Sequence, residues 1–111
     1  MPYNPFNIAL GDKLKAVDLN QLTEGKVAEG YLVEYKSDFP ANEKIGHSVA
    51  SFANTYGGWY CVGIKTDAHH IASEICGFLL SSCPDPISKI REVVKSHVHP
   101  TPLFHPQLIP L

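Results

Sequence analysis

The stretch that decides the fold is residues 29–64, which read EGYLVEYKSDFPANEKIGHSVASFANTYGGWYCVGI. Alternating side chains over residues 31–36 predict a strand. After an N-cap at Asn42, apolar residues recur at i, i+4, i+7 and i+8, which predicts a helix with one apolar face. Two glycines at 57–58 predict a turn, and the apolar run at 59–64 is typical of a central strand. The stretch therefore predicts a strand–helix–turn–strand unit.

The flanking segments supply further elements. An Asp18 N-cap, with a glutamine three residues later, predicts a short helix that stops at Gly25. The residues at 73–78 are expected to pair back onto the run at 59–64 across a polar hairpin loop. Residues 103–111 are expected to form a last strand at a sheet edge, because two prolines there each lack an N–H donor.

The clearest helix start lies at Asp85, where the carboxylate can cap the helix and Pro86 occupies the first helical position. An apolar face follows, and Pro100 ends the helix. Together the elements predict the α+β class, with a mixed, mostly antiparallel sheet and about three packed helices in one domain. We expect residues 1–17 to be an N-terminal arm and residues 18–111 to be the domain.

Composition narrows the class of protein. A chain of 111 residues with a mean hydropathy of −0.06 fits one globular domain, and we expect no membrane association, because no apolar run reaches the length of a membrane helix. Three cysteines without close spacing favour reduced thiols and a cytoplasmic setting over a disulfide framework. The net charge of −2 argues against strong, salt-driven phosphate binding unless the lysines and arginines gather on one face.

Glu29 and Glu34 are the first candidate site. Two neighbouring carboxylates can hold a divalent cation or share a proton, as hydrolytic sites do. The simpler interpretation is that Glu34 pairs with Lys36 or lies on a solvated face, and spacing alone favours it.

The second candidate is an anion site built from a turn and three lysines. The turn contains Asn54, Thr55, Gly57 and Gly58, whose backbone N–H groups could cradle a phosphate. Lys36, Lys44 and Lys65 could form one basic edge beside it. The alternatives are a tight turn into a buried strand and a dispersed solubilising surface. No Walker or dinucleotide-binding glycine motif occurs.

Several of these motifs occur in one order that is familiar from a known family. They are EGYLVEYK at 29–36, SFANTYGG at 51–58, VGI at 62–64, ICGF at 75–78, the Asp-Pro at 85–86 and the His-Pro at 99–100. Over about residues 18–111 the chain resembles the Schlafen-type AlbA_2 domain, also called a divergent AAA-4 domain.

The resemblance implies an α+β domain at the N-terminus of larger bacterial proteins, often transcriptional regulators, with a DNA- or RNA-binding role. In animal Schlafen proteins, a related pair of domains forms a metal-dependent ribonuclease whose acidic set begins with two glutamates five residues apart, which Glu29 and Glu34 match. The third acid is usually an aspartate after the Gly-Val of the later strand. Lys65 occupies that place here, and Asp67 is the nearby acid. A lysine repels the cation of such a site but suits a phosphate contact.

Three functions follow as hypotheses. We favour a nucleic-acid-binding domain of a bacterial regulator without a cofactor, in which Lys36, Lys44, Lys65 and the turn contact DNA or RNA, and in which a homodimer would double the basic surface. An interaction or oligomerisation module without a nucleic-acid role is the first alternative. The second is an endoribonuclease that holds Mg²⁺ or Mn²⁺ with Glu29, Glu34 and Asp67. We therefore expect binding in preference to catalysis.

Overall fold

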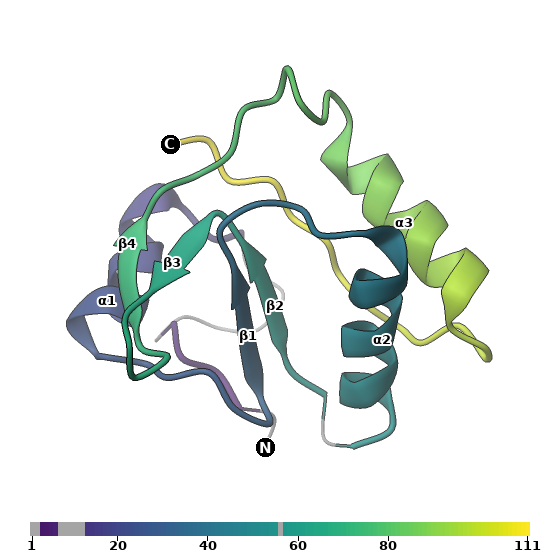
Figure 1. The fold of residues 1–111 in the computed structure, drawn as a ribbon, viewed down its shortest axis with the longest axis horizontal. Coiled ribbons are helices and arrows are strands. Elements are labelled where there is room, and N and C mark those ends of the chain that lie inside the picture. Colours follow the sequence, from purple (N-terminus) through teal and green to yellow (C-terminus); the bar gives the residue numbers. More distant parts are fainter. Residues whose placement is uncertain (1–2, 7–12, 56) are drawn as a thin grey trace.

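The computed structural model describes residues 3–6, 13–55 and 57–111, and Figure 1 shows their arrangement. Part of the expected N-terminal arm, residues 1–2 and 7–12, lies outside this set. The elements in chain order are η1 (Ala16–Leu19), α1 (Asn20–Glu24), β1 (Val33–Lys36), α2 (Asn42–Ala53), β2 (Trp59–Val62), β3 (Ile64–Thr66), β4 (Ala72–Ile75) and α3 (Pro86–His97).

The predicted strand–helix–turn–strand unit is present as β1, α2 and β2. The two strands pair in parallel, with Val33 opposite Trp59 and Lys36 opposite Val62, and α2 connects them. The first strand starts at Val33, two residues later than its alternation predicts, because the Gly30 N–H donates to the Val33 carbonyl across a tight turn. This unit places the even-numbered side chains of β1 on the face toward α2.

The apolar run at 59–64 is divided into two strands at Gly63. This glycine has φ of +100° and lies against Gly77, whose N–H donates to the Gly63 carbonyl at 2.8 Å. After the bend, β3 pairs antiparallel with β4, with Ile64 opposite Ile75. The α+β class is therefore confirmed, and its parallel and antiparallel pairs form two separate two-stranded sheets.

The helix starts include one confirmed cap and two corrections. Asn42 is the first residue of α2 and not its N-cap, since Ala41 holds that position without a side-chain hydrogen bond. Asp85 caps α3 as predicted, since its carboxylate accepts the Ser88 N–H at 3.2 Å and Pro86 is the first helical residue. Asp18, by contrast, is not an N-cap: it lies inside η1, and its carboxylate reaches back to the N–H of Lys15 at 2.7 Å. Asp18 is the third residue of the helix, and its side chain accepts the N–H of the residue that precedes the helix, which would otherwise lack a partner.

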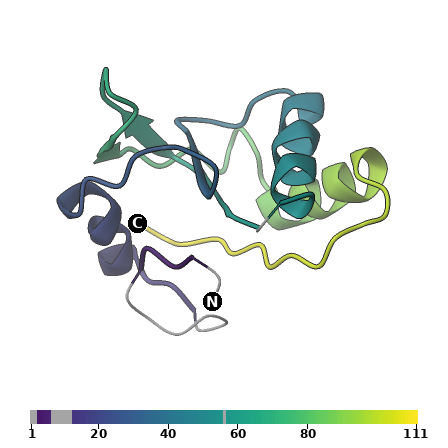
Figure 2. The ribbon, with the colours of Figure 1, turned by 90° about the horizontal axis from the view of Figure 1, so that it is seen from below.

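Two groups of buried side chains hold the layers together. One lies between α1 and the strands and is formed by Phe6, Leu19, Leu22, Val33, Tyr35, Ile64 and Ala72. On the other side of the strands, α2 and α3 pack against each other, and the buried residues there are Ile45, Val93, Val94 and Val98. Figure 2 shows α1 on one side of the strands and the α2–α3 pair on the other.

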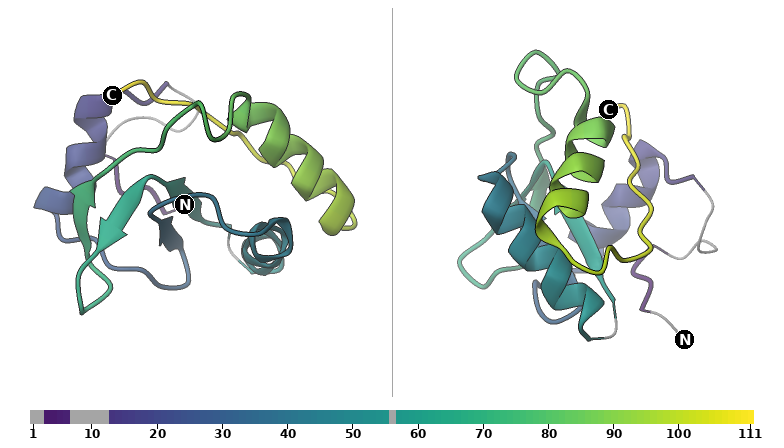
Figure 3. Two further views of the ribbon diagram at one scale, coloured as in Figure 1. Left: turned by 45° about the horizontal axis from the view of Figure 1, so that its top comes forward. Right: turned by 90° about the vertical axis from the view of Figure 1, so that its right-hand side faces the viewer.

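The expected last strand at 103–111 does not form. After α3 the chain runs extended back across the molecule toward the N-terminal segment, without ladder pairing (Figures 2 and 3). The side-chain amide of Gln107 takes the place of a ladder, because it donates to the Leu14 carbonyl at 2.8 Å and accepts the Leu14 N–H at 3.1 Å. Pro106 and Pro110 explain the difference, since neither has an N–H for a strand partner. Within the described ranges, no helix has the length and apolar character needed to cross a membrane.

Candidate nucleic-acid interface

An open groove of about 410 Å³ lies between β1 and the first two turns of α2. Polar and charged side chains from both elements line it: Glu34, Lys36, Glu43, Lys44, His47 and Ser48. Strand alternation brings the first two to the groove, and helical spacing brings the others, because residues four apart on α2 share one face. Two of the three lysines predicted to form a basic edge are therefore neighbours.

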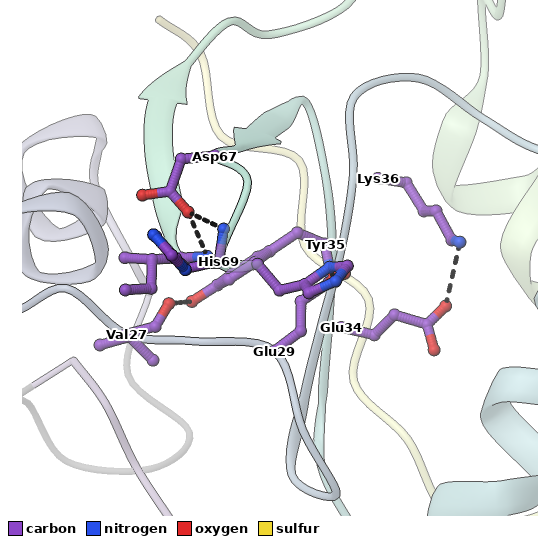
Figure 4. Close-up of polar contacts among 9 residues, drawn as sticks. Val27, Glu29, Glu34, Tyr35, Lys36, Asp67 and His69 are labelled. Carbon is purple, nitrogen blue, oxygen red and sulfur yellow. Dashed lines mark hydrogen bonds and ion pairs between the residues drawn. The ribbon is translucent and has the colours of Figure 1, made fainter.

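Glu34 organises the floor of this groove. Its Oε2 atom accepts a hydrogen bond from the Ser48 hydroxyl at 2.7 Å. The same atom lies 3.6 Å from the Lys36 ammonium (Figure 4). The side chain of Glu34 is 28% exposed and that of Lys36 is 37% exposed. At this exposure the ion pair contributes little to stability, about 0–1 kcal/mol, so its main effect is to restrict where the lysine points.

Tyr60 lies beside this network, in the adjacent strand. The parallel register pairs Tyr60 with Glu34, so both side chains are on the same face of the sheet. The Tyr60 hydroxyl is buried and has no hydrogen-bond partner among the residues that the structure describes. The pKa of the Tyr60 phenol is raised, mainly by burial and to a smaller extent by the negative charge of Glu34. The hydroxyl is consequently held neutral beside a carboxylate.

Glu29 serves a structural purpose at the other side of β1. One oxygen accepts the Tyr35 N–H at 2.9 Å, and the other lies 3.4 Å from Nδ1 of His70. The Glu29 N–H also donates to the His70 carbonyl at 2.8 Å. These contacts tie the residues before β1 to the turn between β3 and β4.

Asp67 shapes that turn. Its Oδ1 atom accepts the N–H groups of Ile71 and His69, and these two hydrogen bonds hold the pKa of the carboxyl below its usual range. Figure 4 shows Glu34 directed away from both Glu29 and Asp67. Over residues 3–6, 13–55 and 57–111, no three histidine, cysteine or acidic side chains are grouped as metal ligands would be. The three carboxylates that the ribonuclease hypothesis requires are thus not brought together.

The turn after α2 uses its amides to end the helix. The N–H groups of Asn54, Thr55 and Gly57 donate to carbonyls of the last helical turn, with Gly57 bonded to the Phe52 carbonyl at 2.9 Å. Gly57 has φ of +80°, and a Cβ at Gly58 would collide with the Phe52 ring. The simpler interpretation of this motif therefore describes it better than an anion cradle, since those three donors already have partners.

Lys65 stands apart from the other two lysines. It is exposed on β3, where the antiparallel register places it opposite Glu74, and it does not line the groove. Asn54 lines a second hollow of about 320 Å³ with residues 97–102. The basic edge is accordingly limited to Lys36 and Lys44, with carboxylates beside them.

Glu43, His47 and Ser48 were missed as site residues, although the sequence carries a signal for them. Glu43 and His47 are four residues apart, as are Lys44 and Ser48, so α2 presents two adjacent polar rows. The spacing does not indicate that this polar face of α2 lies against the even-numbered side chains of β1.

The fold and the groove define a class: a small α+β domain with a mixed-charge groove between a strand and its crossover helix. A comparison with family models identifies residues 29–111 as "Schlafen, AlbA_2". The chain therefore belongs to this family, which is associated with nucleic acids in general, and the match contains every residue of the groove. No curated protein and no solved structure matches the chain.

Proposed function

We propose that this protein binds nucleic acid and that the groove between β1 and α2 is its phosphate-contacting surface. One observation carries the proposal: Lys36 and Lys44, from two different elements, line the same open groove with His47 and Ser48. Ammonium and imidazole groups donate hydrogen bonds to phosphate oxygens, whereas the Ser48 hydroxyl donates to Glu34 and helps to fix that carboxylate. Membership of the Schlafen AlbA_2 family supports the same assignment.

The carboxylates in the groove set the strength of this binding. Glu34 and Glu43 offset the two lysines, and the whole chain has a net charge of −2. We therefore expect moderate affinity with a shallow salt dependence. Two phosphate contacts correspond to a slope of log K against log salt of about −1.4 for a single strand or about −1.8 for a duplex.

Fluorescence anisotropy with labelled DNA and RNA oligonucleotides across a salt series tests the proposal. Replacing Lys36 or Lys44 with glutamine should weaken binding and reduce the slope by about 0.7–0.9 for each lost phosphate contact. Lys95→Gln is the matched control, because it removes the same charge from an exposed position on α3 outside the groove. Absence of binding at low salt, or an equal loss in the control, would refute the proposal.

Glu34→Gln separates binding from catalysis. In a binding groove this change should tighten the complex, because it removes a negative charge 3.6 Å from the Lys36 ammonium and frees that lysine for phosphate. In a metal-dependent endoribonuclease the same change should abolish cleavage of tRNA in the presence of Mg²⁺ or Mn²⁺. We favour binding, because Glu29 and Asp67 are engaged in structural contacts away from Glu34.

A second candidate function is self-association through exposed leucines. Leu79, Leu80 and Leu111 are 72%, 50% and 71% exposed, and Leu111 contacts Gly77, two residues before Leu79. A second copy of the chain is the occupant that would cover them and also double the groove. Light scattering across a concentration series tests this: a dimer that Leu80→Ser dissociates supports it, and a monomer at all concentrations rejects it.

The proposal places the domain in a cytoplasmic bacterial regulator. The three free thiols support a reducing compartment, and the family resemblance supports the regulatory setting.

A further inference from the structure

Tyr31 is the most exposed large hydrophobic side chain of the described residues, at 91%. A tyrosine buries about 150–250 Å² when it packs, so a ring left in solvent gives up one of the larger hydrophobic gains available to any side chain. Single exposed apolar residues are common on protein surfaces and need no explanation by themselves. The surroundings of Tyr31 are what make it informative.

The backbone on both sides of Tyr31 is held firmly. The Gly30 N–H donates to the Val33 carbonyl at 3.0 Å, which closes a turn around Tyr31 and Leu32. The Leu32 carbonyl in turn accepts the Trp59 N–H at 2.8 Å, and Glu29 is fixed by the contacts described above. Tyr31 is therefore presented from a rigid turn, which lowers the entropic cost of contact with a ligand.

Tyr31 lies in the turn two residues before β1, at the end of the strand opposite Lys36. At about 3.3 Å per residue, the strand puts roughly 10 Å between its two ends, Val33 and Lys36. A strand of nucleic acid whose phosphates reach Lys36 and Lys44 can therefore extend to the turn that holds Tyr31. At that point it meets an aromatic ring with a free face.

We propose that Tyr31 is a stacking platform for an unpaired base, so that this domain prefers single-stranded nucleic acid. The inference rests on the proposed function and names the substrate class for the same surface. Stacking needs a base whose π face is free, whereas each base within a duplex is covered by its neighbours in the stack. The lysines supply the sequence-independent phosphate contacts, and the ring supplies a contact that only an unpaired base can make.

Binding of matched oligonucleotides to the full chain tests the inference. The probes are a labelled single strand of about ten nucleotides, within the usual site size for such surfaces, and a duplex of the same sequence. The variants are Tyr31→Ala, Tyr31→Phe and, as a control for loss of an exposed apolar side chain, Leu103→Ala. Leu103 is 90% exposed and, like Tyr31, contributes little to the core, so all three variants should keep the wild-type melting temperature.

We expect wild-type protein to bind the single strand more tightly than the duplex. Tyr31→Ala should weaken single-strand binding roughly tenfold and leave duplex binding unchanged, while Tyr31→Phe and Leu103→Ala should stay within about twofold of wild type. Equal affinity for the two probes, or single-strand binding that Tyr31→Ala retains, overturns the inference and leaves the proposed function standing. No binding of either probe at low salt overturns both.

Discussion

Tyr35 and Tyr60 provide a matched pair of perturbations, because removal of the hydroxyl should change stability in opposite directions. They lie on neighbouring parallel strands but on opposite faces of the sheet, and each substitution by phenylalanine deletes the same hydroxyl group. The Tyr35 hydroxyl donates to the Val27 carbonyl at 2.9 Å. The buried Tyr60 hydroxyl has no partner within the described ranges.

The expected magnitudes follow from this difference. Tyr35→Phe loses one hydrogen bond, while the Val27 carbonyl keeps the Ala72 N–H at 3.2 Å, so the change should cost about 1 kcal/mol of unfolding free energy. Tyr60→Phe removes a polar atom that is desolvated without compensation, which should stabilise the fold by about 1 kcal/mol. For a chain of this length, 1 kcal/mol corresponds to about 4 °C in melting temperature.

Urea titrations and thermal melts at pH 7, followed by circular dichroism, measure both changes. The urea m-values should stay at the wild-type value, since neither substitution alters the surface exposed on unfolding. A double variant should give the sum of the two changes if the sites are independent. Destabilisation by Tyr60→Phe of the same size as by Tyr35→Phe would contradict this prediction, because it would mean that the Tyr60 hydroxyl has a hydrogen-bond partner.

Three further predictions concern packing and protonation. Gly46→Ala should destabilise the fold by about 1–2 kcal/mol in a urea titration, because the new Cβ would lie 2.6 Å from Cβ of His97 on α3. This loss should outweigh the better helix propensity of alanine, and an unchanged urea midpoint would contradict the close approach of the two helices. Burial raises the pKa of the Cys61 thiol to about 12, so alkylation at pH 8, followed by mass spectrometry of peptides, should modify Cys61 far more slowly in the native protein than in urea, and equal rates would exclude a protected site. Burial also raises the phenol pKa of Tyr35 and Tyr60 in the folded state, so the unfolded protein ionises these phenols first and the free energy of unfolding falls as the pH rises above 10. Denaturation curves at pH 9 and pH 11 should show this fall, and it should be smaller in Tyr35→Phe, which lacks one of the two phenols.

Local patterns in the sequence were sufficient for much of the fold. The helices α2 and α3 were predicted from periodicity, and the cap at Asp85 from a single Asp-Pro pair. The turn at Gly57 and Gly58 was predicted too, because glycine has no Cβ and can adopt a positive φ such as the +80° of Gly57. Each of these features depends on a few consecutive residues, so it can be predicted without knowledge of what packs against it.

Other elements were predicted wrongly, because they depend on contacts between residues that are far apart in the sequence. The bend at Gly63 depends on the close approach of Gly77, fourteen positions away in sequence. The segment after α3 pairs through the Gln107 side chain with Leu14, at the opposite end of the chain. Contacts between residues so far apart in sequence have no periodic signature, and the strand expected at 103–111 therefore did not form.

The candidate site divides in the same way. The charged residues available to a site could be read from the sequence, and so could the association of β1, α2 and β2 in one unit. The packing of the elements was needed to show that Glu34 faces Ser48 and Lys36 and that Glu29 and Asp67 lie elsewhere. It was also needed to show that the N–H groups of the turn after α2 donate to carbonyls of that helix. The physical reason is that a strand or helix fixes which face a side chain occupies, whereas the packing of one element on another fixes which faces meet.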